Sequence, residues 1–345
     1  MNKRGFASDN NAGISPEVLT KIAEVNSGHV IGYGDDQYTR EARELFKKHF
    51  GQTASFYFVF SGTAANVLGI SSAVKSFQTV YCTETAHIQV DECGALERFA
   101  GCKIIPIAST DGKMRKEMLE KHMTGFGFEH HSQPALVSIS QPTELGTVYS
   151  IEEIRQLADF AHDNGLRMHM DGARLANAAV SLNCSFIEIT ANAGVDILSF
   201  GGTKNGLMSA ESIVIFNDNL TSDFKYIRKQ GMHLASKMRF ISAQFIAYLE
   251  NDLWKRNAQN ANAMAQKLKT ELTKISQVRI TQQVDANGIF ACIPKQIIAP
   301  LQKDFFFYVW DEKKGEIRWM TSFDTSEEDI DLFVKRIKEF IELYS

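Results

Sequence analysis

Residues 195–216 read VDILSFGGTKNGLMSAESIVIF, and this stretch decides the fold. Its two ends, VDILSF and ESIVIF, are apolar, β-branched runs of the kind that form buried strands. The segment between them, residues 201–210, is rich in glycine and has no helical period. A parallel connection needs a longer crossover, usually through a helix. We therefore predict that ESIVIF is the final strand of a sheet and that it runs antiparallel.

Five earlier strand candidates lie between residues 55 and 171 and alternate with helical patterns. The helical patterns begin at Thr63, Lys116 and Ile151. The strand candidates are SFYFVF, TVYCTE, KIIPIA, ALVSIS and LRMHMD. Such alternation predicts an α/β fold, with a mostly parallel seven-stranded sheet covered by helices on both faces.

The last third of the chain has a different pattern. A largely helical segment at 222–249 and a helix at about 254–275 precede strand candidates VRIT, GIFACI, FFFYVW and EIRWMTSF. An amphipathic helix follows, with Ser326 as its N-cap before an acidic first turn. We predict a large domain with its N-terminal segment at residues 1–250 and a smaller, closely packed α+β domain at residues 251–345.

Composition excludes several classes of protein. The 37 basic and 41 acidic residues give a net charge of -4 without a basic stripe, which disfavours nucleic acid as a partner. No apolar run approaches a membrane span, and MNKRGFASDN lacks the apolar region of a signal peptide, so we expect a cytoplasmic protein. The five scattered cysteines form no CxxC pair, so neither a metal site nor a disulfide framework is expected.

The motif FSGTAAN places Ser61, Gly62 and Thr63 between a strand and the helix that follows. Free N–H groups at a helix amino terminus suit a phosphate, and glycine permits close approach of backbone. An ordinary turn with a Ser or Thr N-cap is the alternative. The absence of GxGxxG and of a P-loop motif disfavours an NAD-dependent dehydrogenase and other nucleotide-binding proteins.

The motif MHMDGARLANA places Asp171 at the carboxyl end of a strand, the edge where open α/β sheets bind ligands. A buried carboxylate needs a cationic partner, and a protonated pyridine nitrogen is one. The alternative is that Asp171 caps the next helix and pairs locally with Arg174. We interpret His169 as a core histidine with satisfied hydrogen bonds.

Lys204 lies among glycines at the end of the strand VDILSF. Burial there lowers the pKa of an amine and makes it nucleophilic, as an imine-forming lysine requires. A solvated surface lysine is the alternative. Together with the phosphate motif and Asp171, in this order, Lys204 predicts pyridoxal 5'-phosphate as the cofactor.

With these motifs, the chain resembles the threonine aldolase and β-eliminating lyase family, from about Phe6 to the last helix. The resemblance implies the fold type I of pyridoxal-phosphate enzymes, that of aspartate aminotransferase. It implies that Lys204 forms the Schiff base and that Asp171 binds the pyridine nitrogen. Ser61, Gly62 and Thr63 would hold the phosphate, with help from Thr203.

The resemblance also implies roles for His87 and Glu92, in TAHIQVDECGAL. His87 matches the histidine that stacks on the cofactor ring, and Glu92 follows it as in the family pattern. Without the resemblance, His87 would be taken for an exposed loop histidine. His131 matches a histidine near the substrate hydroxyl, although its neighbours Glu129 and His130 leave the register open by one residue and a polar loop is the alternative.

Three further matches concern the substrate carboxylate. Ser8 in FASDN, Arg174 in DGAR and Arg318 in EIRWMTSFD correspond to the residues that bind it in the family. Arginine binds a carboxylate through two parallel hydrogen bonds. For Arg318, a charge on the strand surface is the alternative.

The implied activity is cleavage of L-threonine or L-allo-threonine to glycine and acetaldehyde. His87, His131 or an ordered water is the candidate base for the β-hydroxyl proton. The alternatives are β-elimination from another amino acid and a catalytically silent regulatory protein on the same scaffold. The segment QPTELG replaces the family's commoner Asn-Thr-His pattern, and GGTKNG has no serine directly before the lysine, which leaves stereochemistry open.

The family also implies a homo-oligomer, a dimer of dimers with active sites at the dimer interface. Arg228, Lys229 and Lys237 lie in the helical segment after residue 222, where each could reach the phosphate of a neighbouring subunit. Solvated surface charges are the favoured interpretation of all three.

Overall fold

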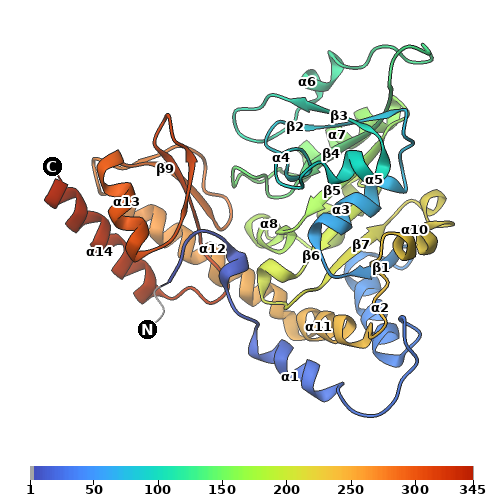
Figure 1. The fold of residues 1–345 in the computed structure, drawn as a ribbon, viewed down its shortest axis with the longest axis horizontal. Helices are drawn as coiled ribbons and strands as arrows, with labels where there is room; N and C mark the ends of the chain where they lie inside the picture. The colour runs from blue at the N-terminus through green and yellow to red at the C-terminus, as the bar shows by residue number, and fades with distance from the viewer. Residues whose placement is uncertain (1–3, 345) are drawn as a thin grey trace.

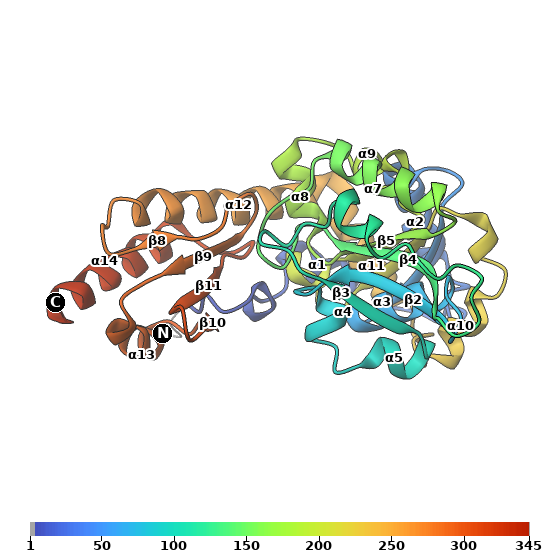
Figure 2. The same cartoon turned by 90° about the horizontal axis from the view of Figure 1, so that it is seen from above.

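The computed structural model describes residues 4–344 and contains two separate sheets. Figure 1 shows the seven-stranded sheet and the four-stranded sheet at opposite ends of the long axis of the molecule. Helix α12 (Leu253–Leu272) runs from one end toward the other, as Figure 2 shows from above. It contacts α8 (Leu175–Leu182) beside the large sheet and α14 (Glu327–Tyr344) beside the small one.

The large sheet has the strand order β1-β7-β6-β5-β4-β2-β3. Strand β7 pairs antiparallel with both β6 and β1, whereas the other pairs are parallel, so the predicted antiparallel final strand is confirmed. The strands are β1 (Ser55–Val59), β2 (Gln78–Thr83), β3 (Lys103–Ile107), β4 (Gln133–Ser140), β5 (Arg167–Gly172), β6 (Ile197–Gly201) and β7 (Glu211–Ile215).

Helices cover both faces of this sheet, with α7 and α9 above it and α5 below it in Figure 2. Helix α7 begins with a capping box, in which Ser150 and Glu153 each bond the other's backbone N–H. The helices of this part are α1 (Pro16–Glu24), α2 (Gln37–Phe50), α3 (Gly62–Ser71), α4 (His87–Val90), α5 (Ala95–Ala100), α6 (Lys116–Glu120), α7 (Ile151–Asp163), α8, α9 (Phe186–Ile189), α10 (Phe224–Gln230) and α11 (Arg239–Leu249).

The helical segment predicted at 222–249 is divided in two. Helix α10 ends before Gly231, and α11 begins at Arg239. A Cβ on Gly231 would lie 2.4 Å from Cδ2 of Leu68, so the chain passes very close to α3 at this point. The loop between the two helices therefore lies against α3, and its residues 231–233 line one pocket with Ser61 and Thr63 of the phosphate motif.

The small sheet is antiparallel, in the order β10-β11-β9-β8. Its strands are β8 (Arg279–Ile280), β9 (Gly288–Cys292), β10 (Tyr308–Asp311) and β11 (Glu316–Met320), with α13 (Lys295–Asp304) between β9 and β10. The sequence did not predict α13. The predicted cap of α14 is present, because Ser326 Oγ accepts from the backbone N–H of Asp329 at 3.2 Å.

The start of the chain packs against the small sheet. Phe6 belongs to the same buried cluster as Trp319, and its ring stacks on Phe333 at 4.3 Å. Residues before α1 therefore contribute to the core of the C-terminal part, and the division at residue 250 stays a prediction. Within residues 4–344, no helix is long and apolar enough to cross a membrane, and no group of acidic, histidine or cysteine side chains could hold a metal ion.

Candidate active site

Lys204 lies at the carboxyl end of β6, in the short 3₁₀ turn Thr203–Asn205. Burial lowers the pKa of its amine, and the nearby Arg174 lowers it further. The turn requires glycine at 206, where φ is +102° and a Cβ would lie 2.2 Å from Ser15 Oγ. The glycine context therefore packs the lysine closely and favours its neutral, nucleophilic form.

Asp171 lies near the carboxyl end of β5, opposite Ser199 of β6. Its Oδ2 accepts from Asn66 Nδ2 at 2.8 Å, and its Oδ1 accepts from the backbone N–H of Ala173 at 2.9 Å. Burial raises the pKa of Asp171, but the charges of Lys204 and His87 and these hydrogen bonds lower it more, so the net pKa lies below its usual value. A buried, ionised carboxylate with lone pairs to spare is thus held beside Lys204.

Asn66 is a site residue for which the sequence interpretation gave no role. Its Nδ2 donates both to Asp171 and, at 2.8 Å, to Glu92 Oε1. The same Glu92 oxygen lies 2.9 Å from His87 Nδ1, and this contact raises the pKa of His87. A hydrogen-bonded series thus joins His87, Glu92, Asn66 and Asp171. The sequence did contain a signal for this role, because Asn66 is a polar residue within the otherwise apolar helical stretch that follows FSGT.

Glu144, from the unusual segment QPTELG, belongs to the same edge of the sheet. Its Oε1 accepts from the backbone N–H of His87 at 2.9 Å and from Ser140 Oγ at 2.5 Å. Burial raises its pKa, and its Oε2 is buried without a partner in the structure. Glu144 therefore fixes the first residue of α4 and adds a carboxyl group to the site.

The phosphate motif begins α3. Ser61 Oγ accepts from the backbone N–H of Ala64 at 3.2 Å, so the N-cap interpretation of Ser61 holds. Gly62 has open space in front of it, since a Cβ there would meet no atom within 4 Å. Thr63 and Ser61 line a pocket together with His233 from the loop after α10. The helix amino terminus is thus open to an anion.

Thr203 and Glu211 close the connection between β6 and β7. Thr203 Oγ1 accepts from the backbone N–H of Ala210 at 3.3 Å, and its own N–H donates to Glu211 Oε1 at 3.4 Å. Burial raises the pKa of Glu211 to about 7. The contact of Thr203 with phosphate stays a prediction.

The three residues assigned to the substrate carboxylate lie near one another, but their partners were not foreseen. Arg174 pairs with Asp9, at 2.6 Å from Nε to Oδ2, and not with Asp171. Ser8 Oγ accepts from the backbone N–H of Asn10 at 3.2 Å. Arg318 donates to the backbone carbonyl of Ala7 at 3.3 Å. The alternative interpretation of Asp171, a local pair with Arg174, is therefore wrong.

His131 is not near Lys204 in this chain, so its place at the site stays a prediction that requires a second copy of the chain. It precedes β4, whose first residue pairs with the amino end of β2, whereas Ser140 at the other end of β4 pairs with Asp171. The length of β4 separates the two positions by more than ~20 Å at about 3.3 Å per residue. His131 lies instead in a polar loop that also contains His130, and with it lines a surface pocket.

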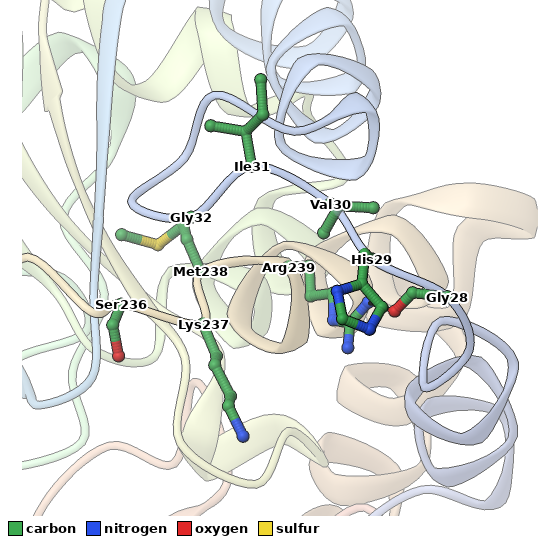
Figure 3. Close-up of a pocket in the computed structure, with 9 residues that line it drawn as sticks. All are labelled: Gly28, His29, Val30, Ile31, Gly32, Ser236, Lys237, Met238 and Arg239. Carbon is green, nitrogen blue, oxygen red and sulfur yellow. Dashed lines mark hydrogen bonds between the residues drawn. The ribbon is translucent and has the colours of Figure 1, made fainter.

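The basic residues after 222 have different surroundings. Arg228 is buried at 7% exposure and donates to the carbonyl of Phe58 at 3.3 Å, so its interpretation as a surface charge is wrong. Lys229 and Lys237 are exposed. Figure 3 shows Lys237 and Arg239 around a hollow beside the loop 28–32.

His169 is a core residue, as predicted. It is 0% exposed, and its ring nitrogens lie 2.9 Å from Ser138 Oγ and 3.1 Å from Ser199 Oγ. Burial lowers its pKa to about 4. It therefore joins three neighbouring strands as a neutral group.

Comparison with known proteins gives one family. A model of the β-eliminating lyase family matches residues 5–295. The chain is 41% identical over 324 residues to a low specificity L-threonine aldolase of a Pseudomonas species, covering 93% of each chain. It is 40% identical over 327 residues to a low specificity L-threonine aldolase of Pseudomonas aeruginosa, covering 94% of each. A solved structure of Leishmania major threonine aldolase matches with a TM-score of 0.93 and 30% identity, over 98% of this chain and 99% of that one. The chain therefore belongs to the β-eliminating lyase family.

Proposed function

We propose that this protein is a pyridoxal-phosphate-dependent aldolase that cleaves L-threonine or L-allo-threonine to glycine and acetaldehyde. The observation that carries the proposal is the placement of Lys204, with its lowered pKa, beside the ionised Asp171 at the carboxyl edge of the sheet. The two Pseudomonas relatives at 41% and 40% identity bear the name low specificity L-threonine aldolase, and each aligns with this chain over nearly its whole length. This similarity favours threonine cleavage among the reactions of the family.

The residues present fit the cofactor. The amine of Lys204 would bind it covalently, and the lone pairs of Asp171 would accept from its ring nitrogen. His87 would lie against the ring, and the amino terminus of α3 at Gly62 and Thr63 would hold its phosphate. When bound, pyridoxal phosphate supplies a conjugated ring that accepts the electrons of the broken bond. The open space at Gly62 and the ionised state of buried Asp171 are the two observations that support this fit.

The arginines and Ser8 would orient the substrate. Arg318, with Ser8 and Arg174, would hold the α-carboxylate so that the Cα–Cβ bond stands perpendicular to the ring, because orientation selects the bond that breaks. His87 would take the β-hydroxyl proton, directly or through a water, since His131 of the same chain lies at the other edge of the sheet. The contact with Glu92 stabilises the protonated form of His87.

The proposal is tested by acetaldehyde release from L-threonine, L-allo-threonine and their D-isomers, with glycine measured alongside. We expect both L-substrates to give equal amounts of the two products. Lys204→Ala should abolish turnover and the visible absorbance of the bound cofactor, whereas Lys116→Ala, at an exposed lysine of α6, should retain both. Release of ammonia and a keto acid from L-serine, without acetaldehyde from threonine, would identify the protein as a β-eliminating lyase instead. Full turnover in Lys204→Ala would refute the site.

We further propose a cytoplasmic homotetramer, a dimer of dimers that supplies glycine in amino-acid metabolism. Large apolar side chains, among them Ile31 at 69% and Met232 at 72% exposure, lie on loops beside the hollow of Figure 3 and the pocket of Thr63. Contact between copies would bury them. His131 could reach a substrate only from another copy. Sedimentation analysis should give the mass of four chains, and a monomer would contradict the proposal.

A further inference from the structure

Arg174 is already paired with a carboxylate of its own chain. Its Nε donates to Asp9 Oδ2 at 2.6 Å, and its NH2 group donates to Asp9 Oδ1 at 2.9 Å. The side chain of Asp9 is 1% exposed and that of Arg174 is 19% exposed. Two parallel, buried bonds fix the plane of the guanidinium. One edge of Arg174 is therefore occupied before a substrate binds, and only its remaining N–H groups are available.

Asp9 is also held from the side of the small sheet. Asn287, directly before β9, donates from Nδ2 to Asp9 Oδ2 at 3.0 Å and to the carbonyl of Thr321 at 2.8 Å. Asn287 is 2% exposed, so this contact is also buried. Asp9 thus connects Arg174, directly before α8 beside the large sheet, with Asn287, directly before β9 of the small sheet.

Arg174 and Arg318 differ in whether an acidic side chain neutralises their charge. Burial raises the pKa of Asp9, but Arg174, Lys204 and the hydrogen bond from Asn287 together lower it more, so Asp9 is ionised and neutralises Arg174. Among residues 4–344, no acidic side chain forms an ion pair with Arg318, and its Nε is buried without a partner. Burial and the charge of Arg174 lower the pKa of Arg318 by more than the charges of Asp9 and Asp91 raise it. Its guanidinium lies 5.3 Å from the ring centre of Trp310. The charge of Arg318 is therefore free for a ligand.

One tripeptide contacts both arginines. The carbonyl of Ala7 accepts from Arg318 and the carboxylate of Asp9 accepts from Arg174, with Ser8 between them. We propose that Asp9 is a positioning residue for the substrate carboxylate, which sets the place of Arg174 relative to Arg318 and leaves Arg318 as the cation without an ion pair. The proposal rests on the proposed function only for the choice of threonine as substrate. The amino acid's α-carboxylate is the group recognised.

The test is Asp9→Asn, which keeps the size of the side chain and removes its charge and one acceptor. Binding is followed by the absorbance change of the holoenzyme on titration with glycine, and with 2-aminoethanol, an amine of similar size without a carboxylate. We expect the Kd for glycine and the KM for L-threonine to rise roughly tenfold, about 1.4 kcal/mol. The Kd for 2-aminoethanol should be unchanged, and kcat should change less than about threefold.

The matched control is Asp324→Asn. Asp324 also pairs with an arginine of the N-terminal segment, since Arg4 NH1 lies 2.9 Å from its Oδ1, but the pair is 23% and 36% exposed. This variant should leave the Kd values for glycine and 2-aminoethanol and the KM for L-threonine unchanged. If Asp9→Asn does not fold, Asn287→Ser removes the contact with Asp9 while keeping its charge, and should raise the glycine Kd by a smaller factor with the same selectivity.

The possible outcomes separate this inference from the proposed function. Glycine binding requires the cofactor and the carboxylate site but no bond cleavage, so it can be measured even if threonine is not a substrate. An unchanged glycine Kd in Asp9→Asn, or an equal loss of affinity for glycine and 2-aminoethanol, would overturn the positioning role. Absence of threonine cleavage in the unmodified enzyme, with the glycine effect present, would overturn only the aldolase assignment.

Discussion

Replacing Asn66 by alanine tests the hydrogen-bonded series that joins His87, Glu92 and Asp171. The Asn66 side chain is buried at 2% exposure and donates to two carboxylates, each at 2.8 Å. A hydrogen bond to a charged group contributes about 1.5–3 kcal/mol, so the loss of both should reduce the free energy of unfolding by roughly 3–6 kcal/mol. Without the amide between them, Asp171 and Glu92 also repel each other directly.

Asn177→Ala is the matched control for this experiment. Asn177 is 3% exposed, lies in a helix as Asn66 does, and donates to the neutral oxygen of Asn262 at 3.0 Å. The volume removed and the gain in helix propensity are the same, so the difference between the variants isolates the charge of the acceptors. A neutral bond contributes about 0.5–1.5 kcal/mol. The assay is urea unfolding of the apoprotein, followed by circular dichroism at one protein concentration.

The pH dependence gives a second measure of the same effect. At neutral pH, Asn66→Ala should cost several times more than Asn177→Ala. As the pH falls, Glu92 is protonated first, because burial raises its pKa, and Asp171 is protonated only at lower pH, because its pKa lies under its usual value. The excess cost of the Asn66 variant should therefore shrink in two steps as each acceptor loses its charge. Equal costs for the two variants at neutral pH would refute the reasoning that Asn66 binds charged acceptors.

Two further predictions concern the turn of the lysine and the proton of the histidine. Gly206→Ala should destabilise the protein by roughly 4 kcal/mol through positive φ and the clash with Ser15, whereas Gly165→Ala, with φ of +76° and open space, should cost only about 1–2 kcal/mol in thermal or urea unfolding. If neutral His87 takes the substrate proton, kcat/KM rises with pH through its raised pKa. Glu92→Gln removes the carboxylate that raises the pKa of His87, so the acid limb of the kcat/KM profile should move to lower pH. An acid limb that stays in place would exclude His87 as the titrating base.

The strands were predictable because their apolar, β-branched runs are separated by turns or by helical patterns of sufficient length. The antiparallel final strand followed from a connection too short for a crossover, and the structure has β7 antiparallel to β6. Helix α13 was missed because its ten residues contain Pro300 and have only a short apolar pattern. A short helix with an internal proline is hard to separate from a loop by period alone.

The distance between His131 and Lys204 in one chain has a physical cause that the sequence already contained. Ligands of open α/β sheets bind at the carboxyl ends of the strands, and that rule placed Asp171 correctly at the end of β5. His131 comes before a strand, at the opposite edge. The family resemblance matched His131 by residue type and by its order along the chain, but it did not say at which end of the strands the side chain lies. The same rule, applied to His131, would have excluded it from a site formed by one chain.

Hydrogen-bond partners that are distant in the sequence could not be predicted, for a different reason. Arg174 follows Asp171 by three residues, so a local pair was the alternative that spacing offered, yet the partner of Arg174 is Asp9. The end of β5 directs Asp171 toward Asn66 of α3, and the N-terminal segment crosses between the two sheets to meet Arg174. Spacing along the chain describes only neighbours on one element, whereas these contacts depend on how separate elements pack.

Arg228 and Arg318 show why the position of a charge in the sequence does not decide whether a ligand can use it. Both guanidinium groups lie near aromatic rings, 5.6 Å from Tyr57 and 5.3 Å from Trp310. Arg228 is 7% exposed beneath β1, where burial lowers its pKa to about 10, so it contributes to packing. Arg318 is partly exposed and held by the carbonyl of Ala7. A variant that removes Arg318 itself would abolish both its charge and its packing. Asp9→Asn leaves Arg318 in place and changes only the carboxylate that holds Arg174 beside it, and is therefore the sharper test of carboxylate recognition.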